Sequence, residues 1–365
     1  MSKANFYPVI LAGGRGKRFW PRSRRRAAKQ VLALDGKQTM IQQTVARLAP
    51  LAPARRFWVI TNRELRPAIL RQLRRLPAAQ VLAEPVGRNT APAIGLAAFI
   101  LLRRDPKAVI GMFPADQVIG DEARFRKVAQ QAAIIAGAGE NVVVLGVKPT
   151  RPETGYGYIE TGERMAPGIL RVHRFTEKPD AARAEEFLRS GKHLWNSGMF
   201  VWSARTLVSA LREHLPATAA RLEKIAAACG TARFASVLRR EYPRCENISI
   251  DYAVLEPRSR KGEAASKLYC IPADFGWNDL GSWASLYEHQ AGPGGSSVIE
   301  ADGRFELDSS GNYIHAPGKF VAAVGVKDLV VVETGDALLV TTRERAHDAA
   351  KVVKHLETKK RRDLL

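Results

Sequence analysis

Apolar positions along this chain fall into short continuous runs that alternate with segments of helical spacing. The runs are rich in Val and Ile, as in parallel strands that are buried on both faces of a sheet. They predict strands at 9–12, 57–61, 108–113, 142–147, 170–175, 199–202 and 267–271. The intervening segments predict helices at 44–48, 64–76, 122–136, 180–189 and 204–214, with one more that begins near residue 91. This alternation predicts an open α/β sheet with parallel strands.

Two of these helices have recognisable starts. Thr39 and Gln42 have the spacing of a capping box ahead of the helix at 44–48. Thr90 can cap the Ala-rich helix, in which Pro92 is tolerated because it lies in the first turn. Both helices are therefore expected to begin at polar residues.

The pattern changes after the Gly-Pro-Gly-Gly sequence at 292–295. From 297 to 342 the chain has short strand-like pieces separated by turn signals, and a long helical pattern returns only at 344–356. We interpret 292–296 as a linker between a large domain at 1–291 and a small β domain at 297–365 that ends in a helix. The short coils of the small domain can stack as a β-solenoid, although no clean repeat period supports this.

The composition is that of an ordinary globular protein with an excess of positive charge. Of the 365 residues, 46% are hydrophobic, and 57 Lys and Arg against 36 Asp and Glu give a net charge of +21. Such a charge attracts nucleotides, sugar phosphates, nucleic acid and acidic membranes without choosing among them. The cations are spread along the chain, which is equally typical of Arg-rich surface helices. The basic tail at 359–362 is expected to fray.

Cysteine usage and hydropathy predict a soluble, cytoplasmic protein. Cys229, Cys245 and Cys270 lack C-x-x-C spacing, which indicates reduced thiols and argues against a disulfide framework or a cysteine-based zinc site. The first apolar run reaches Arg15 too early for a signal peptide, and the apolar run at 91–102 is too short to span a bilayer. The chain also lacks the H-E-x-x-H and G-x-S-x-G segments of zinc peptidases and serine hydrolases.

A glycine-rich loop follows the first predicted strand, at the edge of the sheet where α/β proteins bind ligands. Its glycines at 13, 14 and 16 would let backbone N–H groups approach phosphate oxygens. The loop does not match G-x-G-x-x-G, because Phe19 occupies the last glycine position, and it does not match the P-loop, because Arg18 follows Gly16-Lys17. From this pattern alone, a phosphate-binding loop and a plain strand-to-turn connection are both open.

The segment "LAGGRGKRFWPRSR" (11–24) resembles the signature of the sugar-nucleotide pyrophosphorylases, G-G-x-G-x-R-x-x-P followed by a lysine. Its Trp20-Pro21-x-Ser23 version is similar to that of the mannose-1-phosphate guanylyltransferases. Seven further segments agree in family order: "EPVGRNTAPAI" (84–94), "FPADQ" (113–117), "GYGYIE" (155–160), "FTEKP" (175–179), "WNSGMFVW" (195–202), "ISIDYAVLE" (248–256) and "FGWNDLGSW" (275–283). The resemblance runs from about residue 8 to 290, and a weaker segment at 328–356 extends it into the small domain.

The resemblance implies a Rossmann-like, doubly wound mixed α/β sheet of the nucleotide-diphospho-sugar transferase type. It implies a nucleotidyltransferase that makes GDP-mannose and pyrophosphate from GTP and mannose 1-phosphate, by in-line attack of the sugar phosphate on the nucleotide α-phosphate. Asp116 and Asp279 match the family's metal-binding aspartates, and two carboxylates together with the nucleotide suffice for Mg²⁺. A single aspartate after a strand is more typical of a turn or a helix cap, but the pair in two matching motifs favours the metal.

The resemblance also implies which residues bind the nucleotide. Arg15, Arg18 and Lys29 match the cations that hold the departing pyrophosphate, and arginine can grip two oxygens where lysine acts as a point charge. Residues of the first strand end and loop are expected to contact the nucleotide, namely Leu11, Ala12, Gly13 and Gly14. The arginines at 24–26 have no assigned role and are expected to be solvated or to lie on a mobile flap.

Base and ribose recognition is expected in the E-P-x-G-R-N-T segment, at Glu84, Arg88, Asn89 and Thr90. A carboxylate at 84 can accept from the N1–H and N2–H₂ edge of guanine, a pattern that adenine lacks, although backbone groups can do the same. Thr90 as a cap and Asn89 as a turn residue are compatible with this role.

The sugar side is expected at Gly155, Glu177, Asn196 and Gly198, because carboxylate and amide groups bind hydroxyls. Lys178 matches the lysine that contacts the sugar 1-phosphate. The competing interpretation is that residues 177–179 merely end a strand before a helix, a boundary that the proline at 179 favours in any case.

The chain departs from the family pattern at two positions. Ala28 stands where a proline is usual, so we expect a more mobile loop and a less firmly held Lys29. Gln117 stands where a histidine is often found after the metal-binding aspartate, so any role of that imidazole is absent or replaced.

Three functions are open at this point. The first is the guanylyltransferase, and the second is a pyrophosphorylase for another hexose 1-phosphate or another nucleoside triphosphate. The third belongs to a different class: a basic nucleic-acid-binding protein on an inactive transferase scaffold, motivated by the net charge of +21. The Asp116 and Asp279 pair argues against the third, because an electrostatic binder has no use for carboxylates. A homodimer is an expectation from the family alone.

Overall fold

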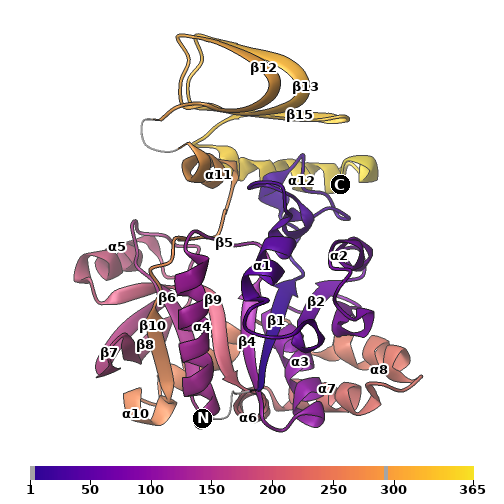
Figure 1. The fold of residues 1–365 in the computed structure, drawn as a ribbon, viewed down its shortest axis with the longest axis vertical. Helices are drawn as coiled ribbons and strands as arrows, with labels where there is room; N and C mark the ends of the chain where they lie inside the picture. Colours follow the sequence, from indigo (N-terminus) through magenta and orange to yellow (C-terminus); the bar gives the residue numbers. More distant parts are fainter. Residues whose placement is uncertain (1–4, 292–294) are drawn as a thin grey trace.

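The computed structural model describes residues 5–291 and 295–365, so residues 292–294 of the predicted linker lie outside the described residues. An α/β part formed by the larger N-terminal portion carries a smaller β part, with helices α11 (Trp283–Gln290) and α12 (Ala349–Thr358) between them (Figure 1). Within the described residues, no helix is both long and apolar enough to cross a membrane. The domain boundary itself stays a prediction.

A mixed sheet forms the centre of the α/β part, in the strand order β3-β2-β1-β4-β9-β6-β10-β8-β7. Its strands are β1 (Asn5–Ala12), β2 (Trp58–Asn62), β3 (Val81–Glu84), β4 (Ala108–Pro114), β6 (Val142–Val147), β7 (Tyr158–Ala166), β8 (Ile169–Thr176), β9 (His193–Ser203) and β10 (Leu268–Pro272). β3, β2, β1 and β4 run parallel, whereas β9 is antiparallel to both of its neighbours β4 and β6. The predicted doubly wound mixed sheet is confirmed. β3 and β7 were not predicted.

Helices cover both faces of this sheet because neighbouring strand residues point to opposite sides. On one face, Val9 of β1 packs with α3 (Thr90–Arg104), α6 (Ala204–His214) and α7 (Pro216–Ala228). On the other face, Ile10 packs with α1 (Met40–Leu48), α2 (Arg66–Gln72) and α4 (Glu122–Gly137). Further helices are α5 (Ala181–Ser190), α8 (Phe234–Glu241), α9 (Glu256–Ser259) and α10 (Glu263–Ser266). The loops at the strand ends between these two layers are thereby free to carry a site.

The helix starts agree with the sequence in one case and differ in the other. α1 has the predicted capping box between Thr39 and Gln42. For α3, the prediction that Thr90 is the cap was wrong: the side chain of Asn89 caps the helix by accepting from the backbone N–H of Thr90. Thr90 is the first helical residue, and its hydroxyl accepts from the backbone N–H of Ile250. The threonine therefore ties the helix start to the segment that follows α8.

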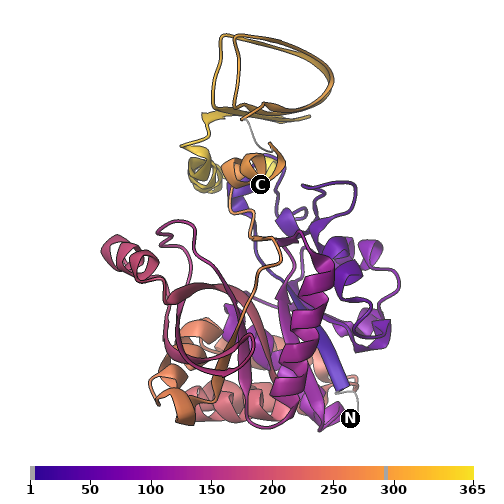
Figure 2. The ribbon, with the colours of Figure 1, turned by 60° about the vertical axis from the view of Figure 1, so that its left-hand side comes forward.

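The β part is a ladder of β12 (Val298–Leu307), β13 (Tyr313–Val324) and β14 (Leu329–Thr334), all parallel, with β15 (Ala337–Thr342) antiparallel at its edge. β12 and β13 bend together into stacked coils (Figures 1 and 2). This stacking of parallel strands agrees with the solenoid-like small β domain that the sequence predicts.

The small β part and the glycine-rich loop share a hydrophobic cluster. Phe19 and Trp20 pack there with Trp283, Tyr313 and Val353. The indole N–H of Trp20 donates to the backbone oxygen of Leu364 at 3.0 Å. Leu364 and Leu365 pack partly buried against this cluster, whereas the basic residues 359–362 are exposed, so the fraying of that tail stays a prediction.

Candidate active site

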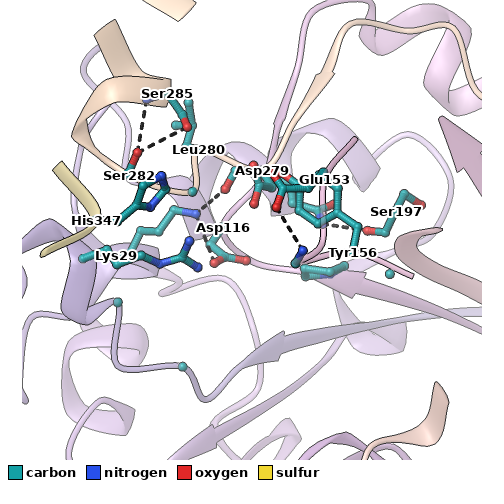
Figure 3. A pocket seen from close by; sticks show the side chains of 18 of the residues that line it. Lys29, Asp116, Glu153, Tyr156, Ser197, Asp279, Leu280, Ser282, Ser285 and His347 are labelled. Carbon is teal, nitrogen blue, oxygen red and sulfur yellow. Dashed lines mark hydrogen bonds and ion pairs between the residues drawn. The ribbon is translucent and has the colours of Figure 1, made fainter. Parts of the chain in front are cut away.

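A cavity of about 810 Å³ lies at the carboxyl ends of β1 and β4, below the helices that connect to the small β part (Figure 3). Its lining comes from the loop after β1, the loop after β4, the segment 151–157, the start of β9 and the start of α11. Nine of the predicted site residues line it: Gly14, Arg18, Lys29, Asp116, Gly155, Glu177, Asn196, Gly198 and Asp279. The structure thus brings residues predicted to bind the phosphates and the metal, and residues predicted to bind the sugar, to one cavity.

Lys29 lies at the end of the cavity where the sequence predicts phosphate binding, which is called the phosphate end below. It lies in the 3-10 turn Lys29–Val31 and only 6% of its side chain is exposed. Its ammonium group donates to Asp116 Oδ2 at 3.2 Å and to the backbone oxygen of Asp279, and it lies 5.6 Å from the ring centroid of Phe19 (Figure 3). A buried cation with two oxygen partners and an open cavity beside it is suited to hold an anion.

Asp116 and Asp279 come from different parts of the chain and meet because two short strands pair. Asp116 follows β4, and β5 (Val118–Ile119) pairs antiparallel with β11 (Trp277–Asn278), directly before Asp279. Both aspartates line the cavity, and the described residues contain no cluster of three or more His, Cys, Asp or Glu side chains arranged for a metal. Two carboxylates that leave the other ligand positions to phosphate and water fit Mg²⁺, which takes oxygen ligands in this way.

Gly281 keeps the Asp279 loop open for Arg18. A Cβ atom on this glycine would lie 3.2 Å from Asp279 Oδ2 and 3.4 Å from Arg18 Nη1, so the guanidinium and the carboxylate both lie close to the glycine backbone. Arg18 comes from the short turn Lys17–Phe19 in the glycine-rich loop. The glycine therefore lets the loop cation approach the aspartate side of the cavity.

Tyr156 lines the same end of the cavity and was missed by the sequence analysis, although it stands inside the quoted "GYGYIE" segment. Burial and the nearby Asp279 carboxylate raise the pKa of its hydroxyl, which therefore stays protonated and can donate a hydrogen bond. Its ring is held edge-on between Trp195 and Trp277, with centroid distances of 5.2 and 5.6 Å. Nothing in the residue pattern distinguishes this tyrosine from one in an ordinary core.

Arg15, predicted to hold phosphate, lies in a neighbouring groove instead. Its guanidinium is 3.1 Å from Glu357 of α12, and the ammonium group of Lys17 reaches the same carboxylate at 3.1 Å. Arg24, to which no role was assigned, pairs with Asp336 at 2.7 Å and donates to the backbone oxygen of Leu364. The expectation that Arg24 is merely solvated was wrong, because it joins the glycine-rich loop to the small β part.

The predicted base-recognition residues are outside the cavity lining that the described residues form, and Glu84 among them lies beside the glycine-rich loop. Glu84 ends β3, is 7% exposed, and accepts a hydrogen bond from the Tyr242 hydroxyl at 2.5 Å. Its other oxygen would lie 3.2 Å from a Cβ atom at Gly13. Burial raises the pKa of Glu84 to about 7. The structure therefore brings this carboxylate directly to the Gly13 backbone.

The other residues predicted to contact the nucleotide come from the segment after β3 and from the end of β1. Arg88 donates to the backbone oxygen of Pro243. Ala12 is buried, and its carbonyl accepts from Gln30 and from Thr61 at 2.9 and 2.8 Å. The remaining predicted contacts in this region are the half-buried Leu11 and the exposed Gly13 at the end of β1.

At the opposite end of the cavity, Glu177 and Asn196 lie with Asp251, a residue for which the sequence analysis gave no role. Lys178 has a backbone φ of 44°, is half-exposed, and pairs with Glu177. Within the described residues it is Glu177, and not Lys178, that reaches the cavity lining. Asp251 thus shares the lining with Glu177 and Asn196, whereas Lys178 lies just outside it.

The two departures from the family pattern have structural counterparts. Gln117 is buried, and its amide donates to the backbone oxygen of Ser197 at 2.7 Å, which joins the loop after β4 to β9. Ala28 is fully buried with φ −69° and ψ 164°, a conformation that proline also adopts. Lys29 is nevertheless placed between its two partners, and the expected mobility of the loop stays a prediction.

Comparison with known proteins assigns the chain to a family that agrees with this fold and this cavity. The Nucleotidyl transferase family model matches residues 7–292, and a model described as MannoseP isomerase/GMP-like beta-helix domain matches residues 303–356. The chain belongs to the nucleotidyl transferase family.

Several relatives cover almost the whole chain. Mannose-1-phosphate guanylyltransferase RfbM of Salmonella typhimurium is 38% identical and matches over 98% of this chain and 74% of its own length. Mannose-1-phosphate guanylyltransferase of Escherichia coli K12 is also 38% identical, over 98% of this chain and 74% of its own length. A crystal structure described as mannose-1-phosphate geranyltransferase from Thermus thermophilus has a TM-score of 0.85 and 34% identity, covering 97% of this chain and 99% of that one.

Proposed function

We propose that the protein transfers a guanylyl group from GTP to mannose 1-phosphate and releases pyrophosphate. The names of the relatives support this substrate pair. The observation that carries the proposal is the position of Lys29 between Asp116 and Asp279, in a cavity whose other end contains the buried Glu177. A cavity of about 810 Å³ has the size range of cofactor and substrate sites.

In the proposed reaction an oxygen of the sugar phosphate attacks the α-phosphorus of GTP. The bond from that phosphorus to the bridging oxygen of the β-phosphate breaks, and pyrophosphate leaves. Lys29 and Arg18 stabilise the negative charge on the phosphate oxygens, and Tyr156 donates a hydrogen bond at the same end. Asp116 and Asp279 would hold Mg²⁺, which supplies further charge neutralisation between the two anionic substrates.

The base is proposed to lie against the Gly13 backbone, where Glu84 is available. One carboxylate oxygen of Glu84 is engaged by Tyr242, and the other faces Gly13. In its ionised form this second oxygen can accept from the N1–H or N2–H₂ of guanine, which adenine does not offer. The lack of a side chain at position 13 is what allows the close approach.

The proposal is tested by measuring pyrophosphate release over a grid of nucleoside triphosphates and sugar 1-phosphates with Mg²⁺. The expected result is the highest turnover with GTP and mannose 1-phosphate, and its loss in Asp116→Ala. Asp274→Ala is the matched control, because Asp274 is 87% exposed and pairs only with Arg124 among the described residues. A different best pair would replace the substrates, and no release with any pair, together with salt-sensitive RNA binding, would exclude the enzyme.

A further inference from the structure

Asp251 lies in the cavity and organises the amide of Asn196. Its Oδ1 accepts a hydrogen bond from Asn196 Nδ2 at 2.8 Å, and Asn196 Oδ1 in turn accepts from the backbone N–H of Gly198 at 2.9 Å. These two hydrogen bonds fix the positions of the donor nitrogen and the acceptor oxygen of the Asn196 amide. Asp251 also begins a π-helical turn, Asp251–Leu255, a local distortion that is frequent at functional sites.

Glu177 lies beside Asp251 and has an unused acceptor. Only 5% of its side chain is exposed, and its Oε1 is paired with Lys178. Its Oε2 is buried and has no hydrogen-bond partner among the described residues. A Cβ atom on Gly157 would lie 2.5 Å from this oxygen, so the oxygen packs directly against the Gly157 backbone and any side chain there would displace it. A buried carboxylate oxygen without a donor is costly, which indicates that the donor comes from a ligand.

The two carboxylates form one acceptor surface at this end of the cavity. Glu177 and Asp251 both line it, and burial, together with the repulsion from Glu177, raises the pKa of Asp251 to about 7. The nearest cation, Lys178, is engaged by Glu177. A site that offers several acceptors and an oriented amide suits a ligand with neighbouring hydroxyl groups, rather than another phosphate.

We propose that Asp251 is a sugar-recognition residue, whose carboxylate accepts a hydroxyl of the hexose ring next to the one accepted by Glu177. Through its hydrogen bond to Asn196, Asp251 also sets the orientation of the Asn196 amide, the third polar group of this subsite. Asp251 therefore contributes to the choice among hexose 1-phosphates that differ at one hydroxyl. This inference rests on the proposed sugar-phosphate transfer but is independent of which hexose is the substrate.

The first experiment compares the KM values of Asp251→Asn with those of the wild type, for the sugar 1-phosphate that gives the highest turnover. We expect the KM for the sugar phosphate to rise about 10-fold to 100-fold, as for a lost hydrogen bond to a charged group, with the KM for GTP changed less than about 2-fold. Asp274→Asn removes the same charge from outside the cavity lining, where the side chain is 87% exposed, and is expected to leave both values unchanged. An unchanged KM for the sugar phosphate in Asp251→Asn would overturn the proposal.

A second measurement separates sugar contact from a structural role. The 2-, 3-, 4- and 6-deoxy analogues of the sugar phosphate are assayed with the wild type and with Asp251→Asn. For one analogue, the increase in KM seen with the wild type should disappear in the variant, because the partner of the missing hydroxyl is already gone. If every analogue keeps its full increase in the variant, Asp251 does not contact the sugar. Should Asp251→Asn fail to fold, Asp251→Ser is compared in the same way.

A failure of the proposed function and a failure of the proposed role of Asp251 give different results. If the wild type has turnover with some other sugar phosphate, the function is revised and the deoxy series of that sugar still tests Asp251. If the wild type uses mannose 1-phosphate and Asp251→Asn behaves as the wild type, the function stands and the role of Asp251 falls.

Discussion

Glu84→Gln is expected to stabilise the protein above neutral pH while it weakens nucleotide selection. Glu84 is 7% exposed, and burial raises its pKa from 4.5 to about 7. In the unfolded chain the same carboxyl group ionises near its usual value. Glutamine has nearly the same shape and can still accept from Tyr242, so the substitution removes the ionisation and leaves the hydrogen bond.

The sign and size of the effect follow from the pKa. Between about pH 4.5 and pH 7 the unfolded chain has lost a proton that the folded chain keeps, so the wild type becomes less stable as the pH rises. A shift from 4.5 to about 7 corresponds to about 3 kcal/mol in the free energy of unfolding, as an upper order of magnitude. This contribution is present below the unfolded pKa and is lost as the pH rises through the folded one. Other groups titrate equally in both proteins and cancel in the difference.

The assay is urea unfolding of the wild type and Glu84→Gln at about pH 5 and about pH 8. The stability of the variant relative to the wild type should increase by about 2 to 3 kcal/mol between the two conditions. In pyrophosphate-release assays, the KM for GTP should rise and the preference for GTP over ATP should fall. A stability difference that does not change with pH would refute the buried, proton-holding carboxylate, and unchanged discrimination would refute its contact with guanine.

Three further outcomes are expected. Lys29→Met should lower kcat about 100-fold or more with a small change in the KM for the sugar phosphate, because it removes a buried cation from the phosphate end; unaltered kcat would contradict this role. Ala28→Pro should raise the free energy of unfolding by about 0.4 to 1 kcal/mol, measured by urea denaturation, because φ is −69° already; a loss of stability would show that the buried site has no room for the ring. The KM for the sugar phosphate should rise as the pH falls below about 7, because Asp251 then becomes protonated. Asp251 faces Glu177, Lys178 and Asn196, and Asp251→Asn should remove this pH dependence. A wild-type KM that does not change with pH would contradict this prediction.

Periodicity predicted the elements that are buried on both sides and failed where burial is partial. The runs at 142–147 and 204–214 coincide with β6 and α6, because a continuous apolar run or a strong helical stripe is fixed by the core it faces. The first residues of β7 pair with both β8 and β9, but most of its second half is exposed, so its sequence lacks such a run. β3 has only four residues, too few for a period to be visible.

Site residues could be predicted where a motif specifies the residue type. They could not be predicted where their role depends on which residues the fold places beside them. Lys29, Asp116 and Asp279 are recognisable because cations and carboxylates stand at fixed places in quoted segments, and they do meet in one cavity. Asp251 stands in a quoted segment as well, but only the pairing of its carboxylate with Asn196 and the nearby Glu177 distinguishes it from a helix-start aspartate. That information is tertiary and has no local signal.

The glycine-rich loop is also held by tertiary contacts that have no local sequence signal, and several of these come from the small β part. Phe19 and Trp20 follow Arg18 directly, and their rings are buried in the cluster that contains Trp283 and Tyr313. The Trp283 indole N–H donates to the Trp20 carbonyl at 3.0 Å, and Arg24 pairs with Asp336. The position of Arg18 in the cavity therefore depends on residues of α11 and of the β part. Because a cation stabilises a phosphate group effectively only when it is held in place, we expect the small β part to support the proposed reaction by fixing this loop.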